Sequence, residues 1–244
     1  MKMMKFKMLV CLLALAGISF TSCNNDEGYS LDKAWYSIAT LNPMGDSKSY
    51  WLTLDDGTTI WPVATNIPWF YPKERQRAFV IYTLLSDEFQ GYSHAAKILD
   101  IETILTKPIA ENLGDGNDEK YGADPVKITD IWIGDGFLNI VFDFDYGGNA
   151  VHYINLIPRN DADTPYSFEF RHNAYNDDKR YRRSAIVAFD LSSIKTEGEV
   201  ELAINVQTFD GEKVYKVKFD SSNPTLKTFA QNKSYKKDKF IKTR

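Results

Sequence analysis

The chain has 244 residues, of which 43% are hydrophobic and 25% charged, with a formal net charge of −4 at pH 7 and two cysteines. A negative net charge argues against nucleic acid as a partner, because phosphate binding requires clustered Lys and Arg. The length is sufficient for one large or two modest domains.

Residues 1–22 have the three regions of a secretory signal peptide. Three lysines precede an apolar run at residues 8–18, and small residues precede Cys23. The run is shorter than the about 20 residues of a membrane-spanning helix. The arrangement resembles a relaxed form of the lipobox of bacterial lipoproteins, whose cysteine is acylated and becomes the new N-terminus. We therefore predict lipid attachment at Cys23, which anchors the protein in a membrane. The alternative is an ordinary signal peptide that leaves a free thiol.

Residues 23–32 form an acidic tether that begins with Asn-Asn-Asp-Glu at residues 24–27. In Bacteroides-type Gram-negative bacteria, such residues after the lipidated cysteine resemble the signal that sends lipoproteins to the cell surface. A solvated tether has the same composition. The expected location is therefore the outer membrane, on its surface-exposed or its periplasmic face. Without residues 1–22 the chain has 222 residues, with 26 Lys and Arg against 33 Asp and Glu, and Cys23 as its sole cysteine. It can form no internal disulfide.

Residues 33–106 alternate apolar and polar side chains with the period of two that is typical of strands. Strands are predicted at residues 34–42, 49–55, 58–63, 77–86 and 96–105. Asp56-Gly57 predicts a tight primed turn, in which both residues have positive φ. The strand at 77–86 is apolar on both faces, so something else must cover it. Five strands in this length predict a small Greek-key barrel of the OB type.

Residues 107–125 are rich in Gly, Asp, Asn and Pro and break this alternation, which predicts a linker. Asp115, Asn117 and Glu119 occupy alternate positions within it and have oxygen atoms that calcium prefers. The spacing lacks the later bidentate glutamate of an EF-hand. A solvated loop is the favoured interpretation.

Residues 126–220 alternate again and predict an antiparallel β-sandwich of seven strands. The strands are predicted at residues 126–133, 137–146, 150–158, 166–174, 184–191, 199–209 and 213–219. In the second of these, Phe142 and Phe144 face the core whereas Asn139, Asp143 and Asp145 face outward. Asp143 and Asp145 precede a Gly-Gly turn, where acids increase solubility or hold calcium. The final residues, 221–244, form a basic tail that is either solvated or docked on an anionic surface.

The order of these features resembles the NigD-like lipoproteins of Bacteroides-type bacteria. The resemblance rests on the lipobox cysteine, TLDDGTTIWP, DPVKITDIWIGDGFLNIVFDF, HYINLI and FEFRHNAYND, and it covers nearly the whole chain after the signal. It implies an N-terminal OB-like barrel and a C-terminal β-sandwich, but no activity or site residues. Tyr175 stands where a small turn residue is expected, which predicts a longer turn there.

No catalytic residues are identified. His94, His152 and His172 are isolated in the sequence, and HExxH, GxSxG and GxxxxGK[ST] motifs are absent. His172 is interpreted as a core histidine at a strand end. No metal and no cofactor are therefore expected. A glycosidase needs two carboxylates across a cleft, which the sequence alone does not identify.

The best candidate for a contact surface is the segment at residues 60–77, where aromatic residues gather in a Pro-interrupted connection. Its candidate contact residues are Trp61, Trp69, Phe70, Tyr71 and Arg75. Aromatic rings stack on sugars or anchor protein interfaces. The alternative is that these rings close the barrel or pack against the second domain.

Two functions are retained from these observations. The first is a non-catalytic binding or accessory lipoprotein with a protein or glycan ligand. The second is a bacteriocin-associated immunity or self-protection lipoprotein, which rests on the origin of the family name. A carboxylate-dependent hydrolase comes third.

Overall fold

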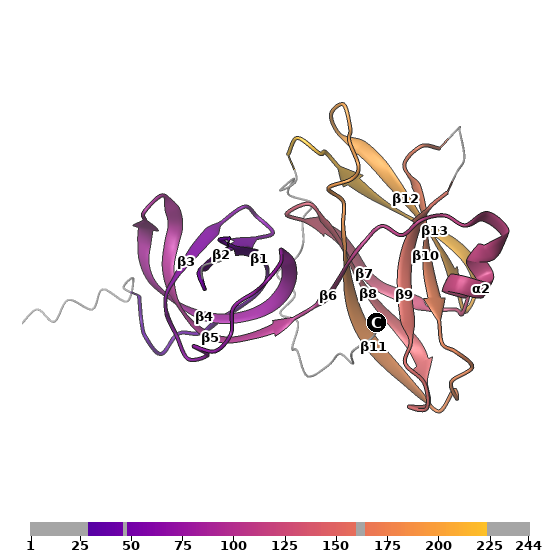
Figure 1. The fold of residues 1–244 in the computed structure, drawn as a ribbon, viewed down its shortest axis with the longest axis horizontal. Helices are drawn as coiled ribbons and strands as arrows, with labels where there is room; N and C mark the ends of the chain where they lie inside the picture. Colours follow the sequence, from indigo (N-terminus) through magenta and orange to yellow (C-terminus); the bar gives the residue numbers. More distant parts are fainter. Residues whose placement is uncertain (1–28, 46–47, 160–163, 224–244) are drawn as a thin grey trace, which may run out of the picture.

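The computed structural model describes residues 29–45, 48–159 and 164–223. It has two β domains, and the chain crosses from one to the other at β6 (Leu105–Pro108) (Figure 1). The predicted all-β fold, a barrel followed by a sandwich, is confirmed. Cys23, the signal and residues 224–244 of the tail lie outside the described residues. In the described part, no helix is long and apolar enough to span a membrane.

The first domain is a closed barrel with strand order β1-β2-β3-β5-β4. Its strands are β1 (Trp35–Pro43), β2 (Tyr50–Leu54), β3 (Thr59–Thr65), β4 (Gln76–Phe89) and β5 (Tyr92–Thr103). Neighbours pair antiparallel except β3 and β5, which run parallel. Alternate apolar side chains, such as Leu41, Leu52 and Ile60, are fully buried inside the barrel. The five predicted strands are therefore present in an OB-type arrangement.

The turn between β2 and β3 differs from the prediction. Only Gly57 has positive φ, at 86°, and Asp56 does not. The N–H of Gly57 donates to the carbonyl of Leu54, and the N–H of Leu54 donates to that of Thr58. This geometry fits a three-residue loop with a glycine bulge, not a two-residue primed turn. The prediction of a primed turn is wrong, because a dipeptide motif does not determine loop length.

The second domain consists of two four-stranded sheets, with strand orders β13-β12-β10-β9 and β6-β11-β8-β7. Its other strands are β7 (Lys127–Gly134), β8 (Phe137–Tyr146), β9 (Tyr153–Pro158), β10 (Ser167–Asn173), β11 (Tyr181–Asp190), β12 (Val200–Thr208) and β13 (Gly211–Phe219). The prediction missed β6. It also missed that β10 pairs parallel with β12 and β6 with β11, so the sandwich is not wholly antiparallel.

The core between the two sheets is aromatic and aliphatic. Phe142 and Phe144 of β8 are fully buried there, as predicted. Asn139 also points away from this core as predicted, yet it is fully buried. The barrel covers that outer face of β8, and this explains the buried polar side chain.

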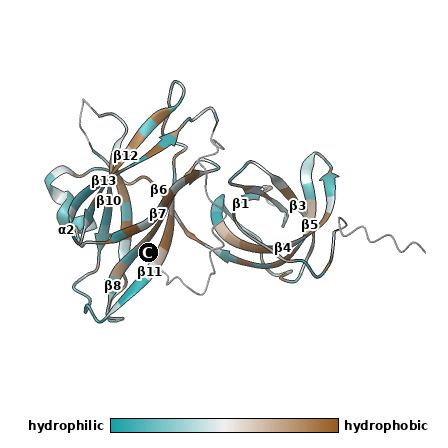
Figure 2. Cartoon of the chain, turned by 180° about the vertical axis from the view of Figure 1, so that it is seen from behind, coloured by the Kyte–Doolittle hydropathy of each residue, from teal (hydrophilic) through white to brown (hydrophobic). Residues whose placement is uncertain are grey.

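The two domains share a third apolar cluster. Trp132, Phe137 and Val141 of the sandwich are buried in it, and Ile38 and Phe79 of the barrel pack against it. Figure 2 shows hydrophobic segments (brown) of β4 and β7 between the domains. The sandwich is therefore what covers the outer apolar face of β4.

Residues 107–125, predicted as a linker, lie against the sandwich. The N–H of Ala110 donates to the carbonyl of Leu156 in β9. Further along are η1 (Gly114–Gly116) and α2 (Asn117–Tyr121), and the side chain of Tyr121 is buried. The turn after β10 is tight, since the N–H of Asp177 donates to the carbonyl of Ala174 and Tyr175 and Asn176 both have positive φ. Tyr175 thus lies in a tight turn within the connection from β10 to β11, which spans residues 174–180.

Candidate functional site

The five predicted contact residues do not form one surface. Phe70 is half-buried against the barrel core and meets Tyr50 edge-on at 6.2 Å between ring centroids. Arg75 pairs with Asp135 of the sandwich at 2.9 Å, and its guanidinium lies 4.4 Å from the centroid of Phe137. Both therefore have structural roles, one closing the barrel and the other joining the domains, as in the alternative interpretation.

Trp69 and Tyr71 are exposed. The indole of Trp69 is 74% exposed, and the ammonium of Lys48 lies 5.1 Å from the ring centroid of Tyr71. They are accessible, but they do not pack with one another in a cluster. A single exposed ring is a weak basis for a site.

Trp61 forms a cluster with two aromatic residues that the sequence analysis did not select. The centroid of its ring lies 5.0 Å from that of Tyr92, and the ring centroid of Trp51 lies 5.8 Å from that of Tyr92. Trp51 and Trp61 alternate with the buried Leu52 and Ile60, so they face outward from β2 and β3. We call Trp51, Trp61 and Tyr92 the aromatic platform.

Neutral polar side chains lie next to the platform along these strands. Thr59 of β3 and Ser93 of β5 hold the two strands together, with their hydroxyl oxygens 3.2 Å apart and each hydroxyl accepting the other residue's N–H. Across β2, the Asn42 amide donates to the hydroxyl of Thr53 at 3.0 Å. The strands beneath the rings are thus fixed, and the platform is a pre-formed apolar surface.

A second cluster joins two histidines that the sequence presented as isolated. Nδ1 of His152 lies 2.9 Å from Nε2 of His172, and Nε2 of His152 lies 3.1 Å from a carboxylate oxygen of Asp177. Both rings are buried and stack with centroids 5.1 Å apart. Phe144 packs against both. The interpretation of His172 as a core histidine agrees with its burial, and the fold brings it to His152, 20 residues away in the sequence.

Asp177 anchors this cluster. Burial by itself raises the pKa of its carboxyl, but the N–H groups of Gly147, Asn149 and Gly148 and the ring of His152 donate to it and lower the pKa overall. The carboxylate form is therefore strongly favoured. It ties the β8–β9 turn to the β10–β11 turn at one end of the sandwich.

The protonation of the two rings follows from this carboxylate. A carboxylate only accepts, so Nε2 of His152 donates to Asp177, which leaves Nδ1 of His152 as the acceptor toward His172. Nε2 of His172 must then donate, and Nδ1 of His172 keeps its lone pair. That Nδ1 atom is buried and has no hydrogen-bond partner. Burial and the neighbouring His152 lower the pKa of His172 to about 4, so the ring is neutral at pH 7.

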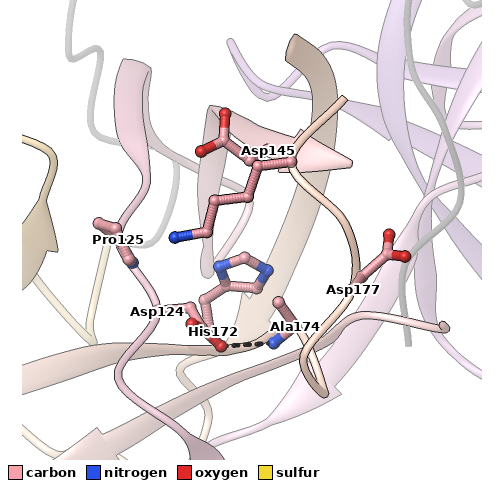
Figure 3. Close-up of a pocket in the computed structure, with 7 residues that line it drawn as sticks. Asp124, Pro125, Asp145, His172, Ala174 and Asp177 are labelled. Carbon is pink, nitrogen blue, oxygen red and sulfur yellow. Dashed lines mark hydrogen bonds between the residues drawn. The ribbon is translucent and has the colours of Figure 1, made fainter. Parts of the chain in front are cut away.

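His172 lines a small pocket at this end of the sandwich. The other lining residues are Asp124, Pro125, Asp145, Ala174, Asp177 and Lys179. Figure 3 shows the imidazole among the three acidic residues, with the Asp124 carboxylate accepting the N–H of Ala174. The cavity is about 10 Å³, which is room for about one water molecule.

The residues considered for calcium bond to protein groups. The Asn117 side chain accepts the N–H of Leu113 and donates to Asn112. Asp143 accepts the hydroxyl proton of Ser184, and Asp145 pairs with Arg182 at 3.2 Å. Neither Asp115 nor Glu119 joins such a set: among the described residues, no three His, Cys, Asp or Glu side chains are arranged to hold a metal ion.

Four residues of these two clusters were not predicted as site residues from the sequence: Trp51, Tyr92, His152 and Asp177. The strand alternation around Trp51 marks it as outward-facing, which is the one available signal. The others come together only through strand pairing and loop packing. Tyr92 is 31 residues from Trp61 and Asp177 is 25 residues from His152 in the chain.

Family models match most of the chain. Residues 38–104 match the NigD-like N-terminal OB domain, and residues 108–219 match the NigD-like C-terminal beta sandwich domain. No curated protein gives a match.

Several solved structures are similar. A protein from Parabacteroides distasonis, described provisionally as toxin-related, is 46% identical, with a TM-score of 0.72 over 79% of this chain and 98% of that one. A NigD-like immunity protein from Bacteroides caccae is 18% identical, with a TM-score of 0.57 over 77% of this chain and 93% of that one. A protein from Bacteroides fragilis, described provisionally as a lipoprotein, is 12% identical, with a TM-score of 0.57 over 78% of this chain and all of that one. The last two show the shared fold.

Proposed function

Because this chain belongs to the NigD-like family, we propose that it is a non-catalytic binding lipoprotein of the cell envelope whose ligand docks on the OB-like barrel. The lipid on Cys23 anchors it at the outer membrane, and the tether at residues 23–32 holds the barrel away from the bilayer. The ligand is a glycan or a protein segment.

The aromatic platform is the observation that carries this proposal. Trp51, Trp61 and Tyr92 lie on the outward side of β2, β3 and β5. OB-type barrels bind ligands across strands 2 and 3. Flat, rigid aromatic rings provide contact area with little loss of side-chain entropy. The likeness at the level of fold is an analogy, whereas the rings are an observation made in this chain.

The proposal is tested with the soluble domains, starting after Cys23. An array of neutral and anionic oligosaccharides and a pull-down of envelope proteins are probed with the native chain and with W61A, W51A and W69A. We expect W61A and W51A to lose the bound species. Trp35 and Trp69 are exposed and lie outside the platform, so W35A and W69A are the matched controls.

Two results would contradict this function. If W61A and W51A both keep the native binding profile, the platform is not the contact surface. If the native chain retains nothing on either the array or the pull-down, a binding role at the barrel is wrong. Circular dichroism of each variant separates lost binding from lost folding.

The location is tested by proteinase treatment of intact cells. The native protein is compared with a variant in which residues 24–27 are replaced by neutral residues. Digestion of the native form alone indicates a surface protein that these residues export. Protection of both forms indicates the periplasmic face.

Immunity or self-protection is the second candidate. It is supported by the descriptions of two similar proteins, the immunity protein from Bacteroides caccae and the provisionally toxin-related protein from Parabacteroides distasonis. It predicts a neighbouring toxin gene and toxin sensitivity when the gene for this chain is deleted. A generic binding protein predicts neither.

A hydrolase has less support. Asp124, Asp145 and Asp177 do line one pocket, but the cavity of about 10 Å³ has no room for a sugar ring. Asp177 is already bonded to three N–H groups and a histidine, and Asp145 is paired with Arg182. None of these carboxylates is placed to act on a glycosidic bond.

A further inference from the structure

The pocket beside His172 has an unusual combination of groups for its size. Its lining includes the carboxylates of Asp124, Asp145 and Asp177 and one donor, Lys179, and Nδ1 of His172 is buried without a partner. We propose that this pocket binds a primary ammonium group. The proposal is independent of the function assigned to the aromatic platform, which lies on the other domain.

The need for a donor follows from the hydrogen-bond chain. Asp177 orients His152, and His152 orients His172, so the lone pair on Nδ1 of His172 is fixed in place. A buried acceptor without a donor destabilises the folded chain, because it has lost its hydrogen bonds to water. Whatever fills the pocket must therefore carry N–H or O–H groups.

The need for positive charge follows from the carboxylates. The carboxylate of Asp177 accepts hydrogen bonds from backbone N–H groups, and the carboxylate of Asp145 forms an ion pair with Arg182. The side chain of Asp124 accepts the N–H of Ala174 at 2.7 Å and forms no ion pair with a Lys, Arg or His side chain of the described residues. Lys179 is the one cationic residue lining the pocket. A cationic donor satisfies both the charge and the lone pair.

Size and shape select the ammonium group among cations. A cavity of about 10 Å³ admits one non-hydrogen atom with its protons, so guanidinium and quaternary ammonium groups do not fit. The apolar side chains of Pro125 and Ala174 lie beside the opening and can contact an alkyl stem. A bare metal ion is disfavoured, because the described residues contain no suitable set of three ligands.

The ammonium group has two possible sources outside this chain, a free amine or a lysine side chain of a partner protein. Lys179 of this chain lines the same pocket and competes with both. Its removal is therefore expected to strengthen binding of an external amine. This competition gives the proposal a test in which a substitution increases binding.

The test uses protein labelled with ¹⁵N in its histidine rings and follows the ring nitrogens by NMR. Methylammonium is titrated into the native chain, with tetramethylammonium as the control that has the charge but no N–H donor. We expect a saturable shift of Nδ1 of His172 with methylammonium alone. In K179Q the same shift of Nδ1 is expected at a several-fold lower concentration of methylammonium.

A lysine-containing peptide and its acetyl-lysine counterpart distinguish the sources. If the peptide binds several-fold more tightly than methylammonium and acetylation abolishes this, a partner's lysine is the ligand. Equal affinities indicate a free amine.

H172Q keeps an N–H donor toward His152 but replaces Nδ1 by an amide oxygen in a different position, and it is expected to abolish the response seen at His152. The midpoint of urea unfolding of H172Q shows whether this variant is folded. If H172Q does not fold, K179Q still tests the proposal, because Lys179 is exposed and its substitution leaves the core unchanged. The proposal is overturned if neither the native chain nor K179Q responds to methylammonium. It is also overturned if tetramethylammonium produces the same shift.

Discussion

The indole Nε1 of Trp132 in the sandwich donates to the carboxylate of Asp55 in the barrel at 2.8 Å, across 77 residues of sequence. The other oxygen of that carboxylate pairs with Arg77, whose side chain is fully buried. Arg77 also donates to the Thr40 hydroxyl at 3.0 Å and to the Asn139 amide oxygen at 3.2 Å. These bonds link both domains to one carboxylate, so the domains are held in a single relative orientation.

Replacing Asp55 with Asn is expected to destabilise the protein strongly. It leaves the buried guanidinium of Arg77 without its counter-charge, and breaking a buried ion pair costs about 3–5 kcal/mol. Urea unfolding measures the loss. D56N is the matched control, since Asp56 only accepts the N–H of Thr58 in the turn and Asn retains that acceptor. Equal stability of D55N and D56N would show that the carboxylate charge is unimportant.

The position of the Asp55 carboxylate leaves no room for a side chain at residue 134, so Gly134 is required there. A Cβ atom there would lie 2.2 Å from Oδ1 and 2.4 Å from Cγ of Asp55, which Arg77 and Trp132 hold in place. We expect G134A to lower the free energy of unfolding by about 1–3 kcal/mol through overpacking.

G116A tests the same substitution where the nearest atom is 3.5 Å away, and it should have no such effect. In a D55A background the cost of G134A should shrink, because the clashing carboxylate is gone. Full additivity of the two substitutions would place the strain of G134A elsewhere.

His172 makes stability depend on pH in the acidic range. Its pKa is about 4 in the folded chain, against 6.5 for an ordinary histidine, because burial disfavours the imidazolium. The unfolded chain therefore binds more protons between these pH values. The contribution of His172 is complete above about pH 6.5 and is lost as the pH falls toward 4, by about 3 kcal/mol in all.

The measurement is the free energy of unfolding in urea from pH 7.5 to pH 4.5. The native protein should lose stability more steeply below pH 6.5 than H172Q does, since both share every other acidic and basic group. Parallel curves for the two proteins would mean that His172 does not titrate between these limits.

The turn between β4 and β5 is open to stabilisation. Gln90 and Gly91 both have positive φ, at 51° and 88°, between the paired residues Phe89 and Tyr92. This is the geometry for which Asn-Gly is preferred, because Asn tolerates the left-handed region better than Gln. Q90N is expected to raise the free energy of unfolding by roughly 0.5 kcal/mol.

Thermal unfolding compares Q90N with Q207N, which makes the same change within strand β12 at a residue without positive φ. Only Q90N should raise the melting temperature. A gain in both would point to a general effect of the shorter side chain.

Local patterns determined much of the fold. Alternation along β8 identified Phe142 and Phe144 as core residues, because the period of a strand places every second side chain on one face. Glycine residues located several of the turns between strands, because a turn often requires a positive φ, which Gly adopts most easily. The short strand β6 was missed, because its four residues lie beside a stretch without alternation.

The tertiary structure alone decided which outward faces are covered and which side chains meet. Alternation marks Asn139 as outward, but only the docking of the barrel makes it a buried partner of Arg77. It likewise says nothing of the contact between His152 and His172, or of Trp51 and Trp61 meeting at Tyr92. A strand pattern records the face on which a side chain lies and not its partner across the sheet. Partners are set by long-range pairing, and both candidate sites of this protein consist of such pairs.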